Sequence, residues 1–80
     1  MPGMSQAEQI LEGLGGRGNI VELEACITRL RTELADSSLV DERALRDAGV
    51  HGVMRAGAVV QVVVGPDADT VASDIEALLD

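Results

Sequence analysis

The sequence predicts an α+β fold, a two-layer sandwich in which three helices cover one face of a four-stranded antiparallel sheet. Apolar residues recur at helical spacing in some segments and alternate in others, which gives the order helix, strand, strand, helix, strand, strand, helix. Short connections join the two strands of each pair, and this favours antiparallel pairing. Each helix is apolar on one side only, so all three are expected on the same face of the sheet.

The first helix is expected to begin after Ser5, because Ser5 and Glu8 form the capping-box pattern. Its apolar positions follow at helical spacing: Met4, Ala7, Ile10, Leu11 and Leu14. Gly15 and Gly16 are expected to end it. Residues 1–80 are expected to form one domain, with residues 1–4 as a disordered tail or linker.

Two alternating segments, residues 20–25 and 27–34, predict half-buried strands. In the first strand, one face should carry Val21, Leu23 and Ala25. In the second strand, one face should carry Thr28, Leu30, Thr32 and Leu34. The opposite face of the second strand should carry Ile27, Arg29, Arg31 and Glu33. Cys26 lies between the two segments, so we expect a connection at or near it, with the arginines on the open face of the sheet or at its edge.

The middle of the chain predicts a turn followed by a short helix. Residues 36–38 form the turn cluster Asp-Ser-Ser. Asp41 is expected to cap a helix that runs to Ala48, with Gly49 as the residue after its end.

The last part of the chain predicts the second strand pair and the last helix. Residues 50–55 should form a weak strand interrupted by Gly52, residues 56–57 a turn, and residues 59–64 a strong strand that is nearly all β-branched. Gly65 ends that strand, and Pro66 suits the first turn of the last helix. The apolar stripe of this helix should consist of Val71, Ile75, Leu78 and Leu79.

The composition excludes several classes of function. The formal net charge is −8, and the six basic residues are all arginine. This balance argues against binding to nucleic acid or to an anionic membrane surface, because both need clustered cations. A single cysteine allows no internal disulfide, and no apolar run approaches the length of a membrane span. A cytoplasmic location is therefore expected.

The chemistry is expected at Cys26, with Arg29 and Arg31. A thiol attacks as the thiolate, and nearby cations favour that form. Arg29 and Arg31 are two residues apart, so in a strand both project from one face. Their planar guanidinium groups match the geometry of phosphoryl oxygens, and backbone N–H groups of a tight turn after Cys26 could add further contacts to an anion. This pattern fits a phosphoryl group carried on sulfur.

Less specific interpretations of the same residues stay open at this point. A lone cysteine can be a buried apolar residue, and two arginines on one strand face can be a solvated surface. The domain would then be a regulatory or interaction module without chemistry. Two rival chemistries fail by counting. A tyrosine phosphatase loop needs Arg at the sixth position after the cysteine, where this chain has Thr32, and Cys26 with His51 cannot supply the four ligands of a structural zinc site.

Residues 24–31 resemble the active site of the B domains (IIB) of glucose and N-acetylglucosamine enzymes II of the bacterial sugar phosphotransferase system. That motif reads Asp-Ala-Cys-Ile-Thr-Arg-Leu-Arg, and this chain differs from it only by Glu24. Residues 10–16, 19–20, 40–42 and 60–66 also resemble the family, so the similarity covers nearly the whole chain. Ala25 and Ile27 favour this branch over the sucrose and β-glucoside branch, which typically has His-Cys-Ala-Thr-Arg-Leu-Arg.

The resemblance implies a phosphotransferase that needs no cofactor or metal. Cys26 would accept a phosphoryl group from a phosphohistidine of the IIA component and pass it to a sugar held by the membrane-embedded IIC component. Arg29 and Arg31 would assist the transfer to sugar. The domain would be a monomer in isolation, located at the inner face of the cell membrane through IIC. Glucose and N-acetylglucosamine remain alternatives, because IIC binds the sugar.

Four further positions carry weaker expectations. Ile27, Thr28 and Gln61 are expected to support phosphate binding, with Ile27 also in an apolar rim that contacts the IIA component. Thr28 could instead point inward, and Gln61 could simply face water. His51 is expected to be a surface or loop histidine rather than a phosphocarrier.

Overall fold

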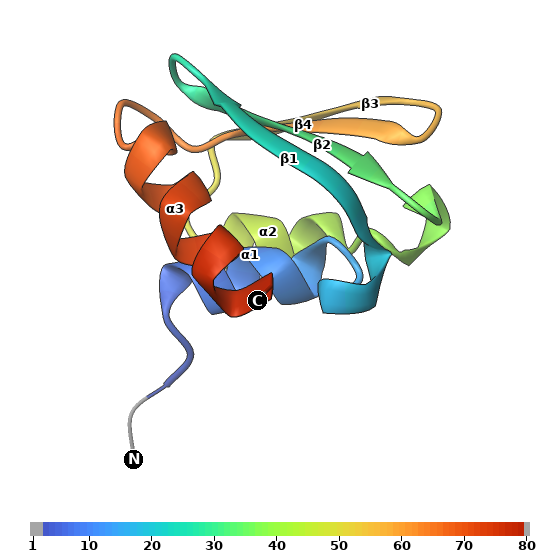
Figure 1. Ribbon diagram of the computed structural model, residues 1–80, viewed down its shortest axis with the longest axis horizontal. Helices are drawn as coiled ribbons and strands as arrows, with labels where there is room; N and C mark the ends of the chain where they lie inside the picture. Colours follow the sequence, from blue (N-terminus) through green and yellow to red (C-terminus); the bar gives the residue numbers. More distant parts are fainter. Residues whose placement is uncertain (1–2, 80) are drawn as a thin grey trace.

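The computed structural model describes residues 3–79 as a sheet with all of its α-helices on one side (Figure 1). The strands are β1 (Ile20–Cys26), β2 (Arg29–Leu34), β3 (Gly52–Ala56) and β4 (Val59–Val63). The helices are α1 (Gln6–Gly13), α2 (Glu42–Asp47) and α3 (Ala68–Leu79), with short 3₁₀ segments at Arg17–Asn19 and Ser37–Leu39. The predicted α+β sandwich and its element order are confirmed.

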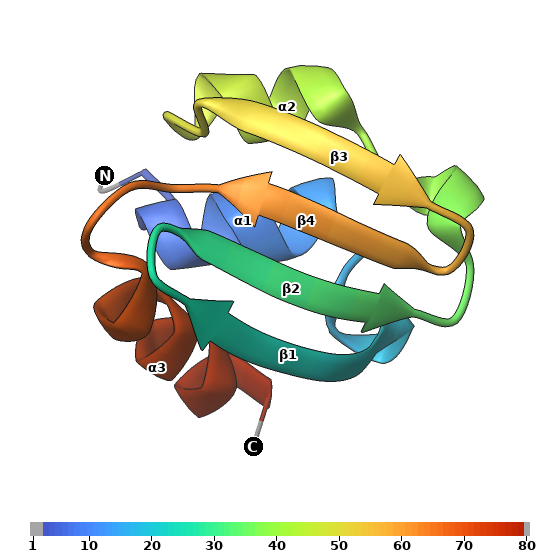
Figure 2. The ribbon, with the colours of Figure 1, turned by 90° about the horizontal axis from the view of Figure 1, so that it is seen from above.

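The sheet has the strand order β1-β2-β4-β3, and all three pairings are antiparallel (Figure 2). Each hairpin, β1–β2 and β3–β4, turns through two residues. The hairpins join through their inner strands β2 and β4. The other face, which we call the open face, is covered by no helix of the described residues, as Figure 1 shows.

The core lies between the inner face of the sheet and the three helices. Leu30, Val60 and Val62 are buried on the sheet side. The helices contribute the fully buried side chains Ile10, Leu45 and Ile75, and Leu14 joins them just after α1. Because no residue of the chain is aromatic, these mid-sized side chains supply the apolar burial, roughly 1.5–3 kcal/mol each.

The predicted helix caps are present. The Ser5 hydroxyl accepts from the Glu8 N–H at 3.2 Å, and the Glu8 carboxylate accepts from the Ser5 N–H at 3.1 Å, which completes the capping box. Asp41 accepts from the N–H of Ala44 at 3.1 Å at the start of α2. Gly49, after the end of α2, has a φ of 93°, a conformation that glycine adopts without steric cost.

One prediction about the faces of β1 is wrong. Val21 is exposed, whereas Leu23 and Ala25, predicted on the same face, pack against the core together with Ile20. The cause is an irregularity in the pairing with β2: Ile20 lies opposite Leu34, but Glu22 lies opposite Glu33. One additional residue in β1, a bulge, reverses the alternation before it, so Ile20 faces inward in place of Val21.

Several predicted boundaries shift by one or two residues. Ile27 and Thr28 form the β1–β2 turn instead of opening the second strand. The second turn is Gly57-Ala58 rather than Ala56-Gly57, and β3 begins at Gly52 and ends at Ala56. β4 ends at Val63, one residue before the predicted end, and α3 begins at Ala68, so Pro66 precedes it.

At the N-terminus, Met4 lies before α1 and is 47 % exposed, so it does not join the apolar face predicted for that helix. The expectation of a disordered tail concerns residues 1–4, of which Met1 and Pro2 lie outside the described residues. Within residues 3–79, none of the helices has the length and apolar character needed to cross a membrane.

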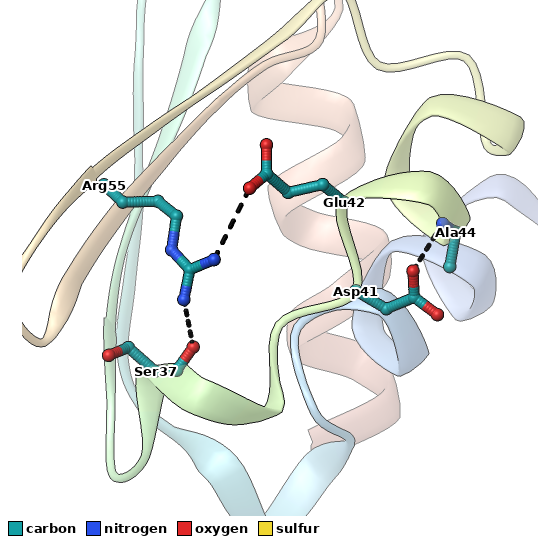
Figure 3. Close-up of polar contacts among 5 residues, drawn as sticks. All are labelled: Ser37, Asp41, Glu42, Ala44 and Arg55. Carbon is teal, nitrogen blue, oxygen red and sulfur yellow. Dashed lines mark hydrogen bonds and ion pairs between the residues drawn. The ribbon is translucent and has the colours of Figure 1, made fainter.

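The end of the sheet farthest from Cys26 is fastened by polar side chains. Buried Asn19 donates to the carbonyls of Leu14 and Asp36 at 2.7 and 2.9 Å and accepts from the Asp36 N–H at 2.8 Å. Arg55 is exposed; it donates to the Ser37 carbonyl at 2.6 Å and pairs with Glu42 at 3.4 Å (Figure 3). The two contacts of Arg55 join β3 to the 3₁₀ segment at Ser37 and to the first residue of α2.

Candidate functional site

Cys26 is the last residue of β1, immediately before the hairpin turn. Its thiol is free and its side chain is exposed, so it is not the buried apolar cysteine that the sequence left open. Arg29 begins β2 directly opposite Cys26. Because directly opposite residues of an antiparallel pair project from the same face, the thiol and the Arg29 side chain both leave the sheet on its open side.

The turn itself has an uncommon backbone. Ile27 has a φ of 57° and is the only residue other than glycine in the described chain with a positive φ. A positive φ at the first of two turn residues is the pattern of a type II′ turn, in which glycine is preferred there. A β-branched residue in this conformation is strained by about 1–2 kcal/mol. The Ile27 side chain is 87 % exposed, so it does not recover this cost by burial within the domain.

The second turn residue ties the hairpin to the rest of the fold. The carbonyl of Thr28 accepts hydrogen bonds from the N–H groups of Val64 and Gly65, both at 3.0 Å. These two residues follow β4 and lead into α3. The turn is thereby held from outside its own hairpin, and this is the condition under which a strained backbone persists.

Arg31 occupies the next outward position along β2. It lies opposite Glu24 on β1, and its Nη1 is 3.7 Å from the Glu24 Oε1 in a half-exposed ion pair. On its other side, Arg31 lies opposite Gln61 of β4, which in turn lies opposite Met54 of β3. These residues form one row across the open face.

Arg29 extends away from β1, diagonally across β4 toward β3. Its Nη1 donates a long hydrogen bond, 4.0 Å, to the Sδ of Met54. Directly across the sheet from Arg29 lie Val63 of β4 and then Gly52 of β3, so Met54 belongs to the neighbouring row, that of Arg31. Arg29 and Arg31 thus lean in opposite directions in this structure, Arg29 toward β3 and Arg31 toward β1.

The structure brings most of the expected site residues together. The open face carries Cys26, Arg29 and Arg31, and Gln61 is half-buried beside Arg31. Ile27 and Thr28 form the turn next to the thiol, but the hydroxyl of Thr28 makes no hydrogen bond within the described residues.

His51 lies outside this group. It is exposed in the segment before β3, as expected of a loop histidine, and its Nε2 is 3.7 Å from where a Cβ on Gly65 would be.

Sequence reasoning missed two neighbours of the arginines, Glu24 and Met54. Glu24 was noted only as a departure from a motif. Its contact with Arg31 follows from register: once the turn is placed at residues 27–28, the residue two before Cys26 lies opposite the residue two after Arg29. The contact between Arg29 and Met54 links two hairpins, and no local pattern in the sequence signals it.

The chemical capacity of this group is to hold an anion on sulfur. Two guanidinium groups can bind the oxygens of a tetrahedral anion beside Cys26, and the exposed turn adds backbone N–H groups. The surface here is open, since the described residues contain no pocket.

Comparisons with known proteins identify the family of the chain. The family described as phosphotransferase system EIIB matches residues 8–41, which include Cys26, Arg29 and Arg31. The N-acetylglucosamine-specific EIIB component of Streptomyces coelicolor is 56% identical over 75 residues, which cover 94% of this chain and 97% of that protein.

Longer relatives contain a similar segment. The glucose-specific EIICBA component of Staphylococcus carnosus is 40% identical over 90% of this chain, which spans 11% of that protein. The glucoside-specific EIICBA component of the same organism is also 40% identical over 90% of this chain and is matched over 10% of its length. The names of both place B, C and A components in one protein.

A solved structure shares the fold. One domain of the phosphotransferase system IIabc component from Clostridium difficile superposes with a TM-score of 0.77 at 20% identity, covering 92% of this chain and 78% of that one. Together with the relative that matches nearly end to end, these findings establish that the chain belongs to the EIIB family of the sugar phosphotransferase system, in its glucose and N-acetylglucosamine branch, whose members accept a phosphoryl group and pass it to sugar together with EIIC.

Proposed function

We propose that the chain acts as a single EIIB domain that carries the phosphoryl group on Cys26, as a protein-phosphocysteine–sugar phosphotransferase. The donor is a phosphohistidine of an EIIA component, and the acceptor is a sugar held by a membrane EIIC component at the inner face of the cell membrane. The observation that carries the proposal is the exposed thiol at a hairpin turn, with Arg29 opposite it and Arg31 on the same face.

In the first transfer, the Cys26 thiolate attacks the phosphorus of the phosphohistidine. The S–P bond forms, the N–P bond breaks, and its electron pair returns to the imidazole nitrogen. Phosphoryl transfer requires mainly positioning and stabilisation of charge, so an exposed thiolate flanked by guanidinium groups is suited to the step. Ile27, Thr28 and Gln61 support phosphate binding, Ile27 and Thr28 through their turn and Gln61 beside Arg31.

In the second transfer, a sugar hydroxyl oxygen attacks the same phosphorus. The O–P bond forms, the S–P bond breaks with its electron pair going to sulfur, and the hydroxyl proton is released to solvent. Arg29 and Arg31 stabilise the charge on the phosphoryl oxygens while the group moves. Arginine suits this role because its planar fork can contact two oxygens at once.

Docking of the EIIA component uses the tip of the hairpin. Ile27 is 87 % exposed beside the thiol, so its side chain can pack against a partner that approaches Cys26. Replacing it by aspartate should weaken binding of EIIA and slow loading of Cys26. Chemical-shift mapping with the EIIA component tests this contact, and unchanged binding and loading by Ile27→Asp would remove Ile27 from the surface.

The test of the function is the intact mass of the domain after incubation with phosphoenolpyruvate, the general components of the system and an EIIA component. The parent should gain one phosphoryl group, and Cys26→Ser should gain none. No gain by the parent, when the same components load another EIIB domain, would favour an interaction module without chemistry.

The role of the arginines is tested by separating loading from delivery. Arg29→Gln and Arg31→Gln should each leave some loading of Cys26 but block transfer to sugar in membranes that contain EIIC. Arg46→Gln is the matched control, because Arg46 is exposed on α2, outside the open face of the sheet. Normal sugar phosphorylation by either site variant would remove that arginine from the transfer.

We propose N-acetylglucosamine as the sugar, because the relative that matches nearly end to end at 56% identity is specific for it, whereas the glucose-specific and glucoside-specific proteins are 40% identical. Supplying the loaded domain to membranes with either an N-acetylglucosamine-specific or a glucose-specific EIIC component tests this. Faster delivery to glucose would contradict it. The isolated domain is expected to be a monomer, which light scattering can check.

A further inference from the structure

We propose that Glu24 is a positioning residue for Arg31: it holds the guanidinium of Arg31 on the strand of Cys26 and masks its charge until an anion arrives on the sulfur. This inference rests on the proposed function of Cys26. It starts from the ion pair between Arg31 Nη1 and Glu24 Oε1 at 3.7 Å.

The register places the four residues in a compact array. Cys26 lies opposite Arg29, and Glu24 lies opposite Arg31. Glu24 and Cys26 are two residues apart on β1, so both project from the open face. A phosphoryl group on Cys26 would therefore be close to the partner that already holds Arg31.

Arg31 has a choice of neighbours across the sheet. On the side of β4 it lies opposite Gln61, which is neutral, and on the side of β1 it lies opposite Glu24. The carboxylate draws the guanidinium to the side of Cys26. Among residues 3–79, Arg29 has no acidic partner, and its Nη1 reaches the Sδ of Met54 on β3 instead. The two guanidinium groups thus lie toward opposite sides of β2, and the carboxylate of Glu24 accounts for the position of Arg31.

The strength of the pair fits a reversible hold. The side chains of Arg31 and Glu24 are 41% and 65% exposed, and water screens an exposed pair of this kind, so it contributes little to stability. A phosphoryl group on Cys26 carries up to two negative charges against the single charge of Glu24. Arg31 can therefore exchange Glu24 for the phosphoryl oxygens without a large loss, and return when the phosphoryl group leaves.

The test uses alkylation of Cys26, which needs neither donor nor sugar. Iodoacetate is an anion and iodoacetamide is neutral, so the ratio of their rates reports how strongly the surroundings of the thiol attract an anion. Using the ratio removes changes in the thiolate fraction, because both reagents attack through the thiolate. Cys26→Ser serves as the blank.

Glu24→Gln should raise the ratio about fivefold at low salt, because it removes one negative charge and unmasks Arg31. In an Arg31→Gln background the same change should raise it only about twofold, the effect of a single charge at this range in water. Glu24→Asp should stay within about twofold of the parent. The control Glu22→Gln removes a charge from the same strand, opposite Glu33 rather than an arginine, and should change the ratio less than Glu24→Gln.

If Glu24→Gln raised the ratio of alkylation rates by the same factor in the parent and in Arg31→Gln, the proposal would be overturned, since Glu24 would then act on the surroundings of the thiol directly. An unchanged ratio in Glu24→Gln would overturn it as well. Loading of Cys26 with a phosphoryl group, measured by intact mass, distinguishes failure of this inference from failure of the proposed function. Normal loading with equal factors counts against Glu24 alone, whereas the expected factors without any loading of the parent count against the proposed function.

Discussion

The two hairpins of the sheet use the same turn geometry with opposite residue choices. In β3–β4 the first turn residue is Gly57, with a φ of 60°, and in β1–β2 it is Ile27, with a φ of 57°. The second turn residue is fastened in both: the Ala58 carbonyl accepts from the Leu34 N–H at 2.8 Å, and the Thr28 carbonyl accepts from Val64 and Gly65. Glycine adopts this φ freely, whereas isoleucine is strained there.

The two turns differ in whether their first residue is the one that gives the most stable fold. The β3–β4 turn serves the fold alone, and its residue is the one that stability favours. The β1–β2 turn adjoins Cys26, and its residue is a strained and exposed isoleucine. Because the strain is not offset by burial within the domain, it points to contact with a partner as the reason for isoleucine at this position.

The largest effect on stability is expected at Asn19, which joins the β1–β2 hairpin to the end of α1. Asn19→Ala removes three hydrogen bonds from a buried site between α1, β1 and the segment after β2. At about 1 kcal/mol for each bond, the free energy of unfolding should fall by about 3 kcal/mol. Urea denaturation measures this. Gly18→Ala is the control, because a Cβ at Gly18 meets no atom within 4 Å, and an equal loss there would contradict the role of Asn19.

The comparison itself is tested by moving isoleucine into the other turn. Gly57→Ile should lower the free energy of unfolding by about 1–2 kcal/mol, because the backbone strain is introduced without a clash: a Cβ at Gly57 meets nothing within 4 Å. Gly57→Asn should cost less, since asparagine tolerates a positive φ. Loading of Cys26 should stay normal in both variants. If Gly57→Ile and the parent were equally stable, the strain assigned to isoleucine at this φ would be contradicted.

The reverse change should stabilise the functional turn. Ile27→Gly relieves the strain but makes the unfolded chain more flexible, so we expect a net gain of about 0.5–1 kcal/mol in the free energy of unfolding. Loading by the EIIA component should slow, because the exposed apolar side chain is lost. Measuring thermal unfolding and the loading rate on the same sample checks both, and a variant that is less stable than the parent would contradict the strain assigned to Ile27.

The smallest effect is expected at Asp36, near the opposite end of the sheet. Hydrogen bonds from the Ser38 hydroxyl and backbone N–H, at 2.6 and 2.9 Å, lower the pKa of the Asp36 carboxyl. A lowered pKa stabilises the fold above the unfolded value, near pH 4, and this contribution is lost as pH falls through the folded pKa. Ser38→Ala should therefore reduce stability slightly above pH 5 and converge with the parent in acid. A difference that grows in acid would contradict the sign.

Much of the molecule follows from local rules. The capping box at Ser5, the cap at Asp41 and the β-branched run in β4 were sufficient to predict those elements. That Cys26, Arg29 and Arg31 lie near one another was also predictable, because they are close in the chain and the strand alternation puts both arginines on one face; their role in phosphoryl transfer stays a prediction. Boundaries near glycines were less predictable, since Gly52 and Gly57 allow a strand to start or turn at more than one residue.

Periodicity along the chain was enough to predict the fold class, the position of the thiol at a connection and the common face of the arginines. Each of these depends on periodicity and on neighbours in the chain. Only the tertiary structure decided the bulge that turns Val21 outward, the left-handed backbone of Ile27, and the partners of the arginines. These depend on register and on contacts between hairpins, which form only when strands distant in the sequence pair and hold one another in place.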